Sequence, residues 1–337
     1  MNNQIIKKKV SFIVPCFNEY KYISNCVKSI LQNNFPLNKI EILIVDGGST
    51  DGSIKLIKKF SKNYKNIFYL YNKNKHLASA WNIGIKNSSG IYIFALNAHT
   101  TMPKNYIQKA INSLLLNKAD CVGPVINTIP QSKGLFANSI ALLLSSPFGV
   151  GSSKFRTGTK KTIIVDTVHC GLYRCQILKK FKFNEKLIRS QDIEYNQRIT
   201  KAGAKIVLDP SLSINYFTRT NMKSFIKYAF INGYWVSNTI NFDVITGSLR
   251  HYVPMLFTIS LSFAIIIKMY LSNSYPVLII ITSYFFLGTL NIFFLKKKLS
   301  IAALITPLIA FFFHILYGLG TLFGFLNSFF KLKFSNE

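Results

Sequence analysis

Carboxylates are scarce in this 337-residue chain, which has twelve Asp and Glu residues against 41 Lys and Arg. An acid–base or metal-dependent reaction therefore has few candidate groups. Two of them lie in the segment 42–53, where four apolar residues run into Asp46, two glycines and Asp51. This pattern predicts a buried strand followed by a binding loop, because glycines at a strand's carboxyl end let the backbone approach a ligand. An ordinary strand–helix turn, with Asp51 or Ser53 as a cap, fits the same residues.

Five other carboxylates complete the set of candidates. They are Glu19, Asp166, Asp192, Glu194 and Asp209. Asp192 and Glu194 open a predicted helix, where a carboxylate is also a common cap. Asp166 and Asp209 fit turns or caps as well as chemistry.

Strands and helices alternate through the first hundred residues. The predicted strands are 10–16, 40–45, 67–70 and 91–96, and the predicted helices are 20–31, 54–60 and 78–85. Further helices are expected at 103–116, 191–202 and 221–238, with strands at 121–125 and 206–208. This alternation predicts a mainly parallel α/β sheet on which the strand ends at Pro15, Asp46 and Leu96 share one edge.

The composition changes at His251, since residues 251–330 contain no Asp or Glu. Three segments approach or exceed the ~20 residues that cross a bilayer: 252–267, 275–295 and 301–326. We expect three spans, with the third as an alternative hairpin or interfacial segment, and an amphipathic surface helix before them. Lys296 to Lys298 predict a cytoplasmic loop and hence a cytoplasmic amino-terminal domain.

The net charge of +29 does not indicate nucleic-acid binding, because the lysines are scattered rather than set in one stripe. A membrane-bound protein of this charge is attracted to anionic headgroups and phosphorylated substrates. The five cysteines lack metal-site spacing and are expected to be core residues of a reduced compartment.

Several motifs, in order, resemble the inverting family-2 glycosyltransferases of the glycosyltransferase-A fold. They are Val14-Pro15-Cys16-Phe17-Asn18-Glu19, Val45-Asp46-Gly47-Gly48-Ser49-Thr50-Asp51-Gly52, Ala80-Trp81-Asn82-Ile83-Gly84 and the triplet Asn97-Ala98-His99. The segments 145–151, 155–158 and 165–168, with Gln191-Asp192, resemble the subgroup of succinoglycan-biosynthesis glucosyltransferases. The likeness covers roughly residues 9 to 240.

The resemblance implies a role for each matching residue. The donor nucleotide sugar would be bound by Pro15, Asn18, Glu19, Asp46, Gly47, Ser49, Asn82 and Asn97, the metal ion by Asn97 and His99, and the general base would be Asp192. The chain departs from the subgroup at Asn97, where an Asp is usual, and at Gln191, where a Glu is usual. A neutral amide is a poor ligand for a hard cation, so Mn²⁺ or Mg²⁺ would be held weakly and largely through the donor's diphosphate. Asn97, His99 and Asp192 also fit plain capping or turn roles.

The resemblance and the tail together predict a multi-pass protein of the cell inner (plasma) membrane with four parts. These are a glycosyltransferase-A domain (1–220), an interfacial helix region (221–250), a transmembrane region (251–330) and a tail (331–337). We expect an enzyme that transfers one sugar from a nucleotide-diphosphate sugar, a UDP-sugar by preference, to a lipid-linked or surface-polysaccharide acceptor at the cytoplasmic face. A polyprenyl-phosphate glycosyl synthase and a non-catalytic nucleotide-sugar-binding component of a glycan assembly complex are the alternatives.

Overall fold

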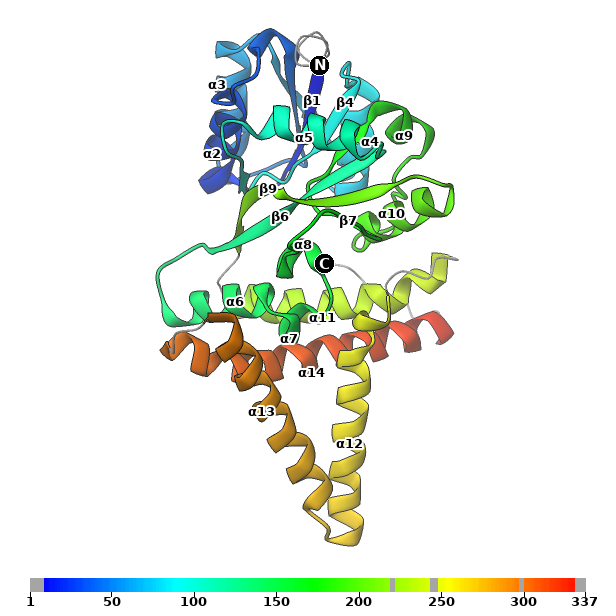
Figure 1. Ribbon diagram of the computed structural model, residues 1–337. Helices are drawn as coiled ribbons and strands as arrows, with labels where there is room; N and C mark the ends of the chain where they lie inside the picture. The colour runs from blue at the N-terminus through cyan, green and yellow to red at the C-terminus, as the bar shows by residue number, and fades with distance from the viewer. Residues whose placement is uncertain (1–8, 219–221, 243–247, 297–299, 331–337) are drawn as a thin grey trace. The chain divides into compact units, whose positions relative to one another are not determined.

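The computed structural model describes residues 9–218, 222–242, 248–296 and 300–330 (Figure 1). The chain divides into two compact units. Residues Met1–Asn127 and Gly158–Tyr216 form the first, here called the sheet unit, and Thr128–Thr157 with Phe217–Glu337 form the second, the helical unit. The four-part division expected from the sequence stays a prediction.

The described residues of the chain contain one nine-stranded sheet, with β7 beside β9 and the other strands in the order β3-β2-β1-β4-β8-β6-β9-β5. The strands are β1 (Val10–Cys16), β2 (Ile40–Asp46), β3 (Ile67–Tyr71), β4 (Tyr92–Ala95), β5 (Thr100–Thr101), β6 (Cys121–Pro130), β7 (Ile163–Ile164), β8 (Leu172–Arg174) and β9 (Ile206–Thr218). Strands β1 to β4 are parallel neighbours, and β8 pairs with β4 in the opposite direction. The expected α/β class is confirmed, and the short strands β5, β7 and β8 were not anticipated.

Helices connect the strands of the sheet unit, and those over Cys175–Lys180 and Leu37–Lys39 were not predicted from the sequence. They are α2 (Tyr20–Leu31), α3 (Ser53–Asn63), α4 (Leu77–Asn87), α5 (Tyr106–Leu116), α9 (Cys175–Lys180) and α10 (Gln191–Lys201), with a short 3₁₀ turn η1 (Leu37–Lys39) before β2. Helix α2 buries Ile23, Cys26, Val27 and Ile30, which lie three to four residues apart on one face. All seven residues of β2 are buried, as expected for a strand covered on both faces of a parallel sheet.

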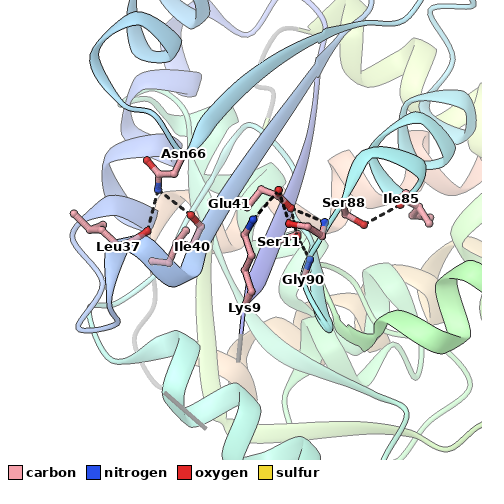
Figure 2. A network of polar contacts seen from close by, with 10 residues as sticks. Lys9, Ser11, Leu37, Ile40, Glu41, Asn66, Ile85, Ser88 and Gly90 are labelled. Carbon is pink, nitrogen blue, oxygen red and sulfur yellow. Dashed lines mark hydrogen bonds and ion pairs between the residues drawn. The ribbon is translucent and has the colours of Figure 1, made fainter. Parts of the chain in front are cut away.

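Glu41 holds together the amino edge of the sheet, which is the edge away from the glycine loop (Figure 2). Its carboxylate accepts hydrogen bonds from the hydroxyl of Ser11, and from the backbone and hydroxyl of Ser89 at 2.9 and 2.7 Å, and lies 3.3 Å from the ammonium of Lys9. Burial would raise the pKa of Glu41, but these hydrogen bonds and the Lys9 charge hold the pKa below its usual value. These contacts therefore offset the free-energy cost of burying the Glu41 charge.

The helical unit begins with three short helices where the sequence pattern is irregular, α6 (Leu135–Ser145), α7 (Pro147–Val150) and α8 (Lys154–Thr157). Helix α11 (Met222–Asn238) and two 3₁₀ turns, η2 (Thr239–Phe242) and η3 (Leu249–His251), precede three long helices. These are α12 (Val253–Leu271), α13 (Tyr275–Lys296) and α14 (Ile301–Phe330), and within the described ranges they are the helices long and apolar enough to cross a membrane. Lys297, Lys298 and the predicted tail lie outside the described residues.

Candidate active site

Asp46 shapes the glycine loop at the carboxyl end of β2. One oxygen accepts hydrogen bonds from the backbone N–H of Gly48 and Ser49 at 2.8 and 2.9 Å, and the other accepts from the Ser49 hydroxyl at 2.6 Å. The side chain is fully buried. The positive φ of Gly48, 85°, permits this tight turn without strain. Asp46 thus fixes the loop's conformation, and its predicted contact with the donor stays a prediction.

The loop is joined to the residues that follow β1, where Pro15 pairs with Val45. The backbone N–H of Asn18 donates to the Ser49 hydroxyl at 2.8 Å, and its side-chain oxygen accepts from Thr50 N–H at 2.9 Å. The next N–H, that of Glu19, donates to the Ser53 hydroxyl at 3.0 Å. Two strand ends that the sequence placed on one edge are therefore linked into a single structure.

Exposed aromatic rings surround this loop. Phe17, Tyr20 and Tyr71 are each about half exposed. A side chain at Gly47 would meet the Phe17 ring, and one at Gly48 would meet the Tyr71 ring. The glycines therefore keep the backbone close to flat apolar rings that are open to solvent.

Asp51, also on the loop, accepts hydrogen bonds from the first residues of helices α2 and α3. Its carboxylate accepts from the backbone N–H of Tyr20 at 2.9 Å and from the backbone and hydroxyl of Ser53 at 3.0 and 2.6 Å. Slight burial favours a higher pKa, but these hydrogen bonds lower the pKa of Asp51. The bonds to Ser53 match the cap on the following helix that the sequence left open, and the bond to Tyr20 adds a contact with α2.

His99 and Asn97 follow β4 and meet residues from three other segments. The Nδ1 atom of His99 lies 3.0 Å from a carboxylate oxygen of Glu19, and the amide nitrogen of Asn97 lies 2.8 Å from Nε2 of His169. The rings of His99 and His169 both pack edge-on against Tyr216 of β9, with centroids 4.9 and 5.5 Å away. These five residues are here called the histidine cluster.

The cluster offers imidazole and amide ligands for a metal ion. In the neutral imidazole, donation from Nδ1 of His99 to the Glu19 carboxylate leaves the lone pair on Nε2. A carboxylate behind an imidazole in this way is the usual arrangement around metal-binding histidines. In the part of the chain that the structure describes, no group of three or more His, Cys, Asp or Glu side chains is arranged to hold a metal ion. The side chains of His99 and Asn97 could therefore supply only part of the coordination of a metal ion.

Asn82 has three hydrogen bonds that fasten α4 to the segment before α10. Its amide nitrogen donates to the carbonyl of Phe183 at 2.9 Å and to Glu185 at 2.8 Å, and its oxygen accepts from Phe183 N–H at 2.9 Å. These contacts position the segment that contains Phe183 and Glu185, and the predicted role of Asn82 in donor binding stays a prediction.

Asp192 lies in the first turn of α10, as predicted, and is partly exposed. The helix is fastened to the segment that contains His169: Asn196 donates to the Thr167 hydroxyl at 2.9 Å and accepts from Tyr173 at 3.0 Å. Thr167 is two residues before His169. Burial, chiefly, and neighbouring charges that include Asp192 raise the pKa of Tyr173 far above its usual range. Asp192 is thus held by a helix tied to the chain that carries His169.

The sequence had not singled out His169 or Tyr216. His169 lies just before β8, and β8 is the strand that pairs with β4 through Phe94 and Leu172. Because β8 runs antiparallel to β4, the residues just before β8 lie near the carboxyl end of β4, close to Asn97 and His99. The sequence signal that could have located His169 was the strand Leu172–Arg174, but three residues are too few to be predicted as a strand.

The sequence of this chain is similar to those of known proteins. Residues 11–182 match the family described as Glycosyl transferase family 2. The chain is 32% identical over 227 residues to a dolichyl N-acetyl-alpha-D-glucosaminyl phosphate 3-beta-D-2,3-diacetamido-2,3-dideoxy-beta-D-glucuronosyltransferase of Methanococcus voltae, a match that covers 65% of this chain and 70% of the relative. It is 27% identical over 213 residues to the succinoglycan biosynthesis protein ExoA of Rhizobium meliloti, covering 62% of this chain and 63% of that protein.

A solved structure shares the fold. The mannosyltransferase PcManGT from Pyrobaculum calidifontis, in complex with GDP-Man and Mn²⁺, superposes with a TM-score of 0.61 at 14% identity, covering 90% of this chain and 87% of that one. The likeness confirms the predicted glycosyltransferase-A-like sheet domain followed by long apolar helices.

Proposed function

The chain belongs to glycosyl transferase family 2, and we propose that it moves one sugar from a UDP-sugar to a lipid-linked or surface-polysaccharide acceptor at the cytoplasmic face of a membrane. Family membership makes it an enzyme that uses a nucleotide sugar, and the long apolar helices indicate a membrane anchor. The observation that carries the finer proposal is the histidine cluster beside the preformed glycine loop. Base, diphosphate and acceptor would each have a place on one sheet edge.

The nucleobase would lie on the exposed rings that surround the glycine loop. Phe17 and Tyr71 offer flat apolar surface, and the glycines let the base reach the backbone. Stacking of a base on an aromatic side chain contributes about 1–3 kcal/mol. Asn18, whose backbone and side chain both bond to the loop, would keep Phe17 in place.

The diphosphate would lie over the histidine cluster together with a divalent ion. His99 Nε2 and the amide oxygen of Asn97 are the protein atoms suited to such an ion, and Glu19 would orient His99. When bound, the ion neutralises the diphosphate leaving group. Since neither ligand is anionic, the donor's phosphates would supply most of the coordination, and Mn²⁺ tolerates imidazole better than Mg²⁺ does.

Asp192 would remove the proton from the acceptor hydroxyl. A general base needs a carboxylate that substrate can reach, and Asp192 is partly exposed on a helix fixed to the segment that contains His169. Its helix neighbour Glu194 is buried and paired with Arg198, and so is committed to structure. Gln191, where the related subgroup has a second acid, leaves the role to Asp192.

Assay of the purified full-length protein with single nucleotide sugars and extracted polyprenyl lipids tests this function. We expect UDP-sugar-dependent labelling of a lipid-linked saccharide, with one sugar added per acceptor. Mass analysis that finds a sugar on a lipid monophosphate would instead support a polyprenyl-phosphate glycosyl synthase. Donor binding without turnover on any lipid or glycan extract would support a non-catalytic component.

A further inference from the structure

Helix α14 is longer than a bilayer requires. Its 30 residues extend about 45 Å, whereas the hydrocarbon core is about 30 Å thick. The 19 residues of α12 and the 22 of α13 extend about 28 and 33 Å, which matches that thickness. The three apolar helices therefore belong to two length classes, and α14 would need a steep tilt to cross.

The exposed apolar residues of α14 form one stripe. They are Ile301, Leu304, Leu308, Phe312, Leu319, Leu326, Phe329 and Phe330, each at least 44% exposed. From Ile301 to Leu326 they are separated by three, four or seven residues, and Phe329 and Phe330 lie three and four residues after Leu326. This spacing places them on one side of a helix over its full length. This pattern is typical of a helix that meets an apolar medium along one face.

The opposite face of α14 is covered by protein. The Ser139 hydroxyl of α6 donates to the carbonyl of Ala302 at 3.0 Å, and the Ser237 hydroxyl of α11 donates to the carbonyl of Thr321 at 2.7 Å. Side chains at Gly320 or Gly324 would collide with the backbone of α11. Helix α14 therefore runs alongside α6 at its start and α11 at its end.

Helix α14 meets helix α12 at the start of α12 and helix α13 near the middle of α13. Gly318 lies against Pro254 and Thr258 at the start of α12, and the Tyr284 hydroxyl of α13 lies 2.8 Å from the His314 ring. The far end of the α12–α13 hairpin projects away from α14 and exposes Met269, Tyr270, Leu271 and Tyr275, each at least 72% exposed (Figure 1). Figure 1 also shows α14 lying across the base of this hairpin rather than parallel to it.

We propose that α12 and α13 cross the bilayer as a hairpin and that α14 lies flat in the membrane interface. Its stripe from Ile301 to Phe330 would rest on the acyl chains, while α6 and α11 cover its other face. The exposed apolar stripe of α14 would contact lipid, because it adjoins the base of a hairpin that is long enough to cross a bilayer. The exposed Lys227 of α11 would assist by attracting anionic headgroups. This two-crossing topology returns the end of α14 to the side on which α12 begins.

Depth measurements on the full chain in phosphatidylethanolamine and phosphatidylglycerol vesicles test the proposal. Single cysteines replace Leu304, Leu319 and Leu326 on α14, with Leu256, Phe263 and Leu271 on α12 as the matched set. Burial raises the pKa of the native thiols of Cys16, Cys26 and Cys121, which slows their alkylation, and Cys175→Ser removes the partly exposed one. A fluorophore on each cysteine is then quenched by lipids that carry quenchers at known depths.

We expect the three α14 positions to report the same shallow depth, and the α12 set to be deepest at Phe263. A depth profile along α14 that is deepest in the middle would overturn the proposal. The side of the membrane on which each terminus lies, read from tags at the two ends of the chain, is a second measurement and needs no cysteine substitution. Both tags on the same side of the membrane are expected, and tags on opposite sides would show three crossings.

Discussion

Glu19 and His99 are 80 residues apart in the chain, and their side chains meet at 3.0 Å at the carboxyl edge of the sheet. The contact joins the segment after β1 to the segment after β4. Because Glu19 is also bonded through its backbone to Ser53, the glycine loop and the histidine cluster share one residue. A change at Glu19 would therefore affect both the nucleotide and the metal regions.

Replacing Asn97 with Asp should tighten metal binding, because it adds an anionic ligand next to His99. We expect the half-saturating Mn²⁺ concentration in a transfer assay to fall several-fold, and Mn²⁺ to support higher turnover than Mg²⁺ in the unaltered protein. His99→Ala should remove most activity. Asn63→Asp, which adds the same charge at the exposed end of α3, is the control. An unchanged metal response of Asn97→Asp, with activity that persists in EDTA, would place the ion elsewhere or exclude it.

Asp192→Asn should lower kcat by a factor on the order of 10² to 10⁴ while donor affinity stays near normal, because the amide cannot accept the acceptor's proton. Steady-state kinetics and donor titration measure the two effects separately. Glu194→Gln is the control on the same helix turn. It breaks the ion pair with Arg198 and should lower thermal stability but leave kcat within a few-fold. Nearly full turnover in Asp192→Asn would refute the assignment.

Phe17→Ala should weaken donor binding about tenfold, since stacking on one ring contributes on the order of 1–3 kcal/mol. The KM for the donor is expected to rise with little change in kcat, because the base does not react. Tyr64→Ala removes another exposed ring, one that follows α3 and packs against Phe60. If Phe17→Ala and Tyr64→Ala have equal donor KM values, Phe17 does not bind the base.

Glu41→Gln should destabilise the sheet unit by about 1–3 kcal/mol at neutral pH, through loss of charge-assisted hydrogen bonds at the amino edge. The folded-state pKa of Glu41 is lowered, so its contribution is present above the unfolded pKa of about 4.3 and is lost as pH falls through the folded value. Thermal unfolding of both proteins between pH 7 and 3 should show melting temperatures that converge at the acidic end. A constant difference across this range would contradict the assignment.

The parallel core of the sheet could be predicted because its strands are apolar runs with helices between them. The ends at Pro15, Asp46 and Leu96 were placed on one edge by topology rules, and the contacts of Asn18, Glu19 and His99 follow from that placement. Local periodicity was sufficient for these elements because each forms a βαβ unit with its neighbours in the chain.

The antiparallel half could not be predicted in the same way. Strand β8 has three residues and β7 has two, and both are defined by partners far away in the chain. His169 was missed for this reason. The hydrogen bonds of Asp46 and Asn82 within the protein could not be predicted either, because a residue type does not show which backbone groups its side chain bonds to.

The glycines between α11 and α14 determine whether these two helices stay together in lipid or in detergent. Gly233, Gly320 and Gly324 let the two backbones touch, and the Ser237 hydroxyl bonds across the contact. Association of this kind depends on shape and on interhelical hydrogen bonds rather than on the release of water, and it operates in lipid as it does in a folded interior. Detergent extraction should therefore leave α11 and α14 joined as one rigid element, whatever solvent surrounds them.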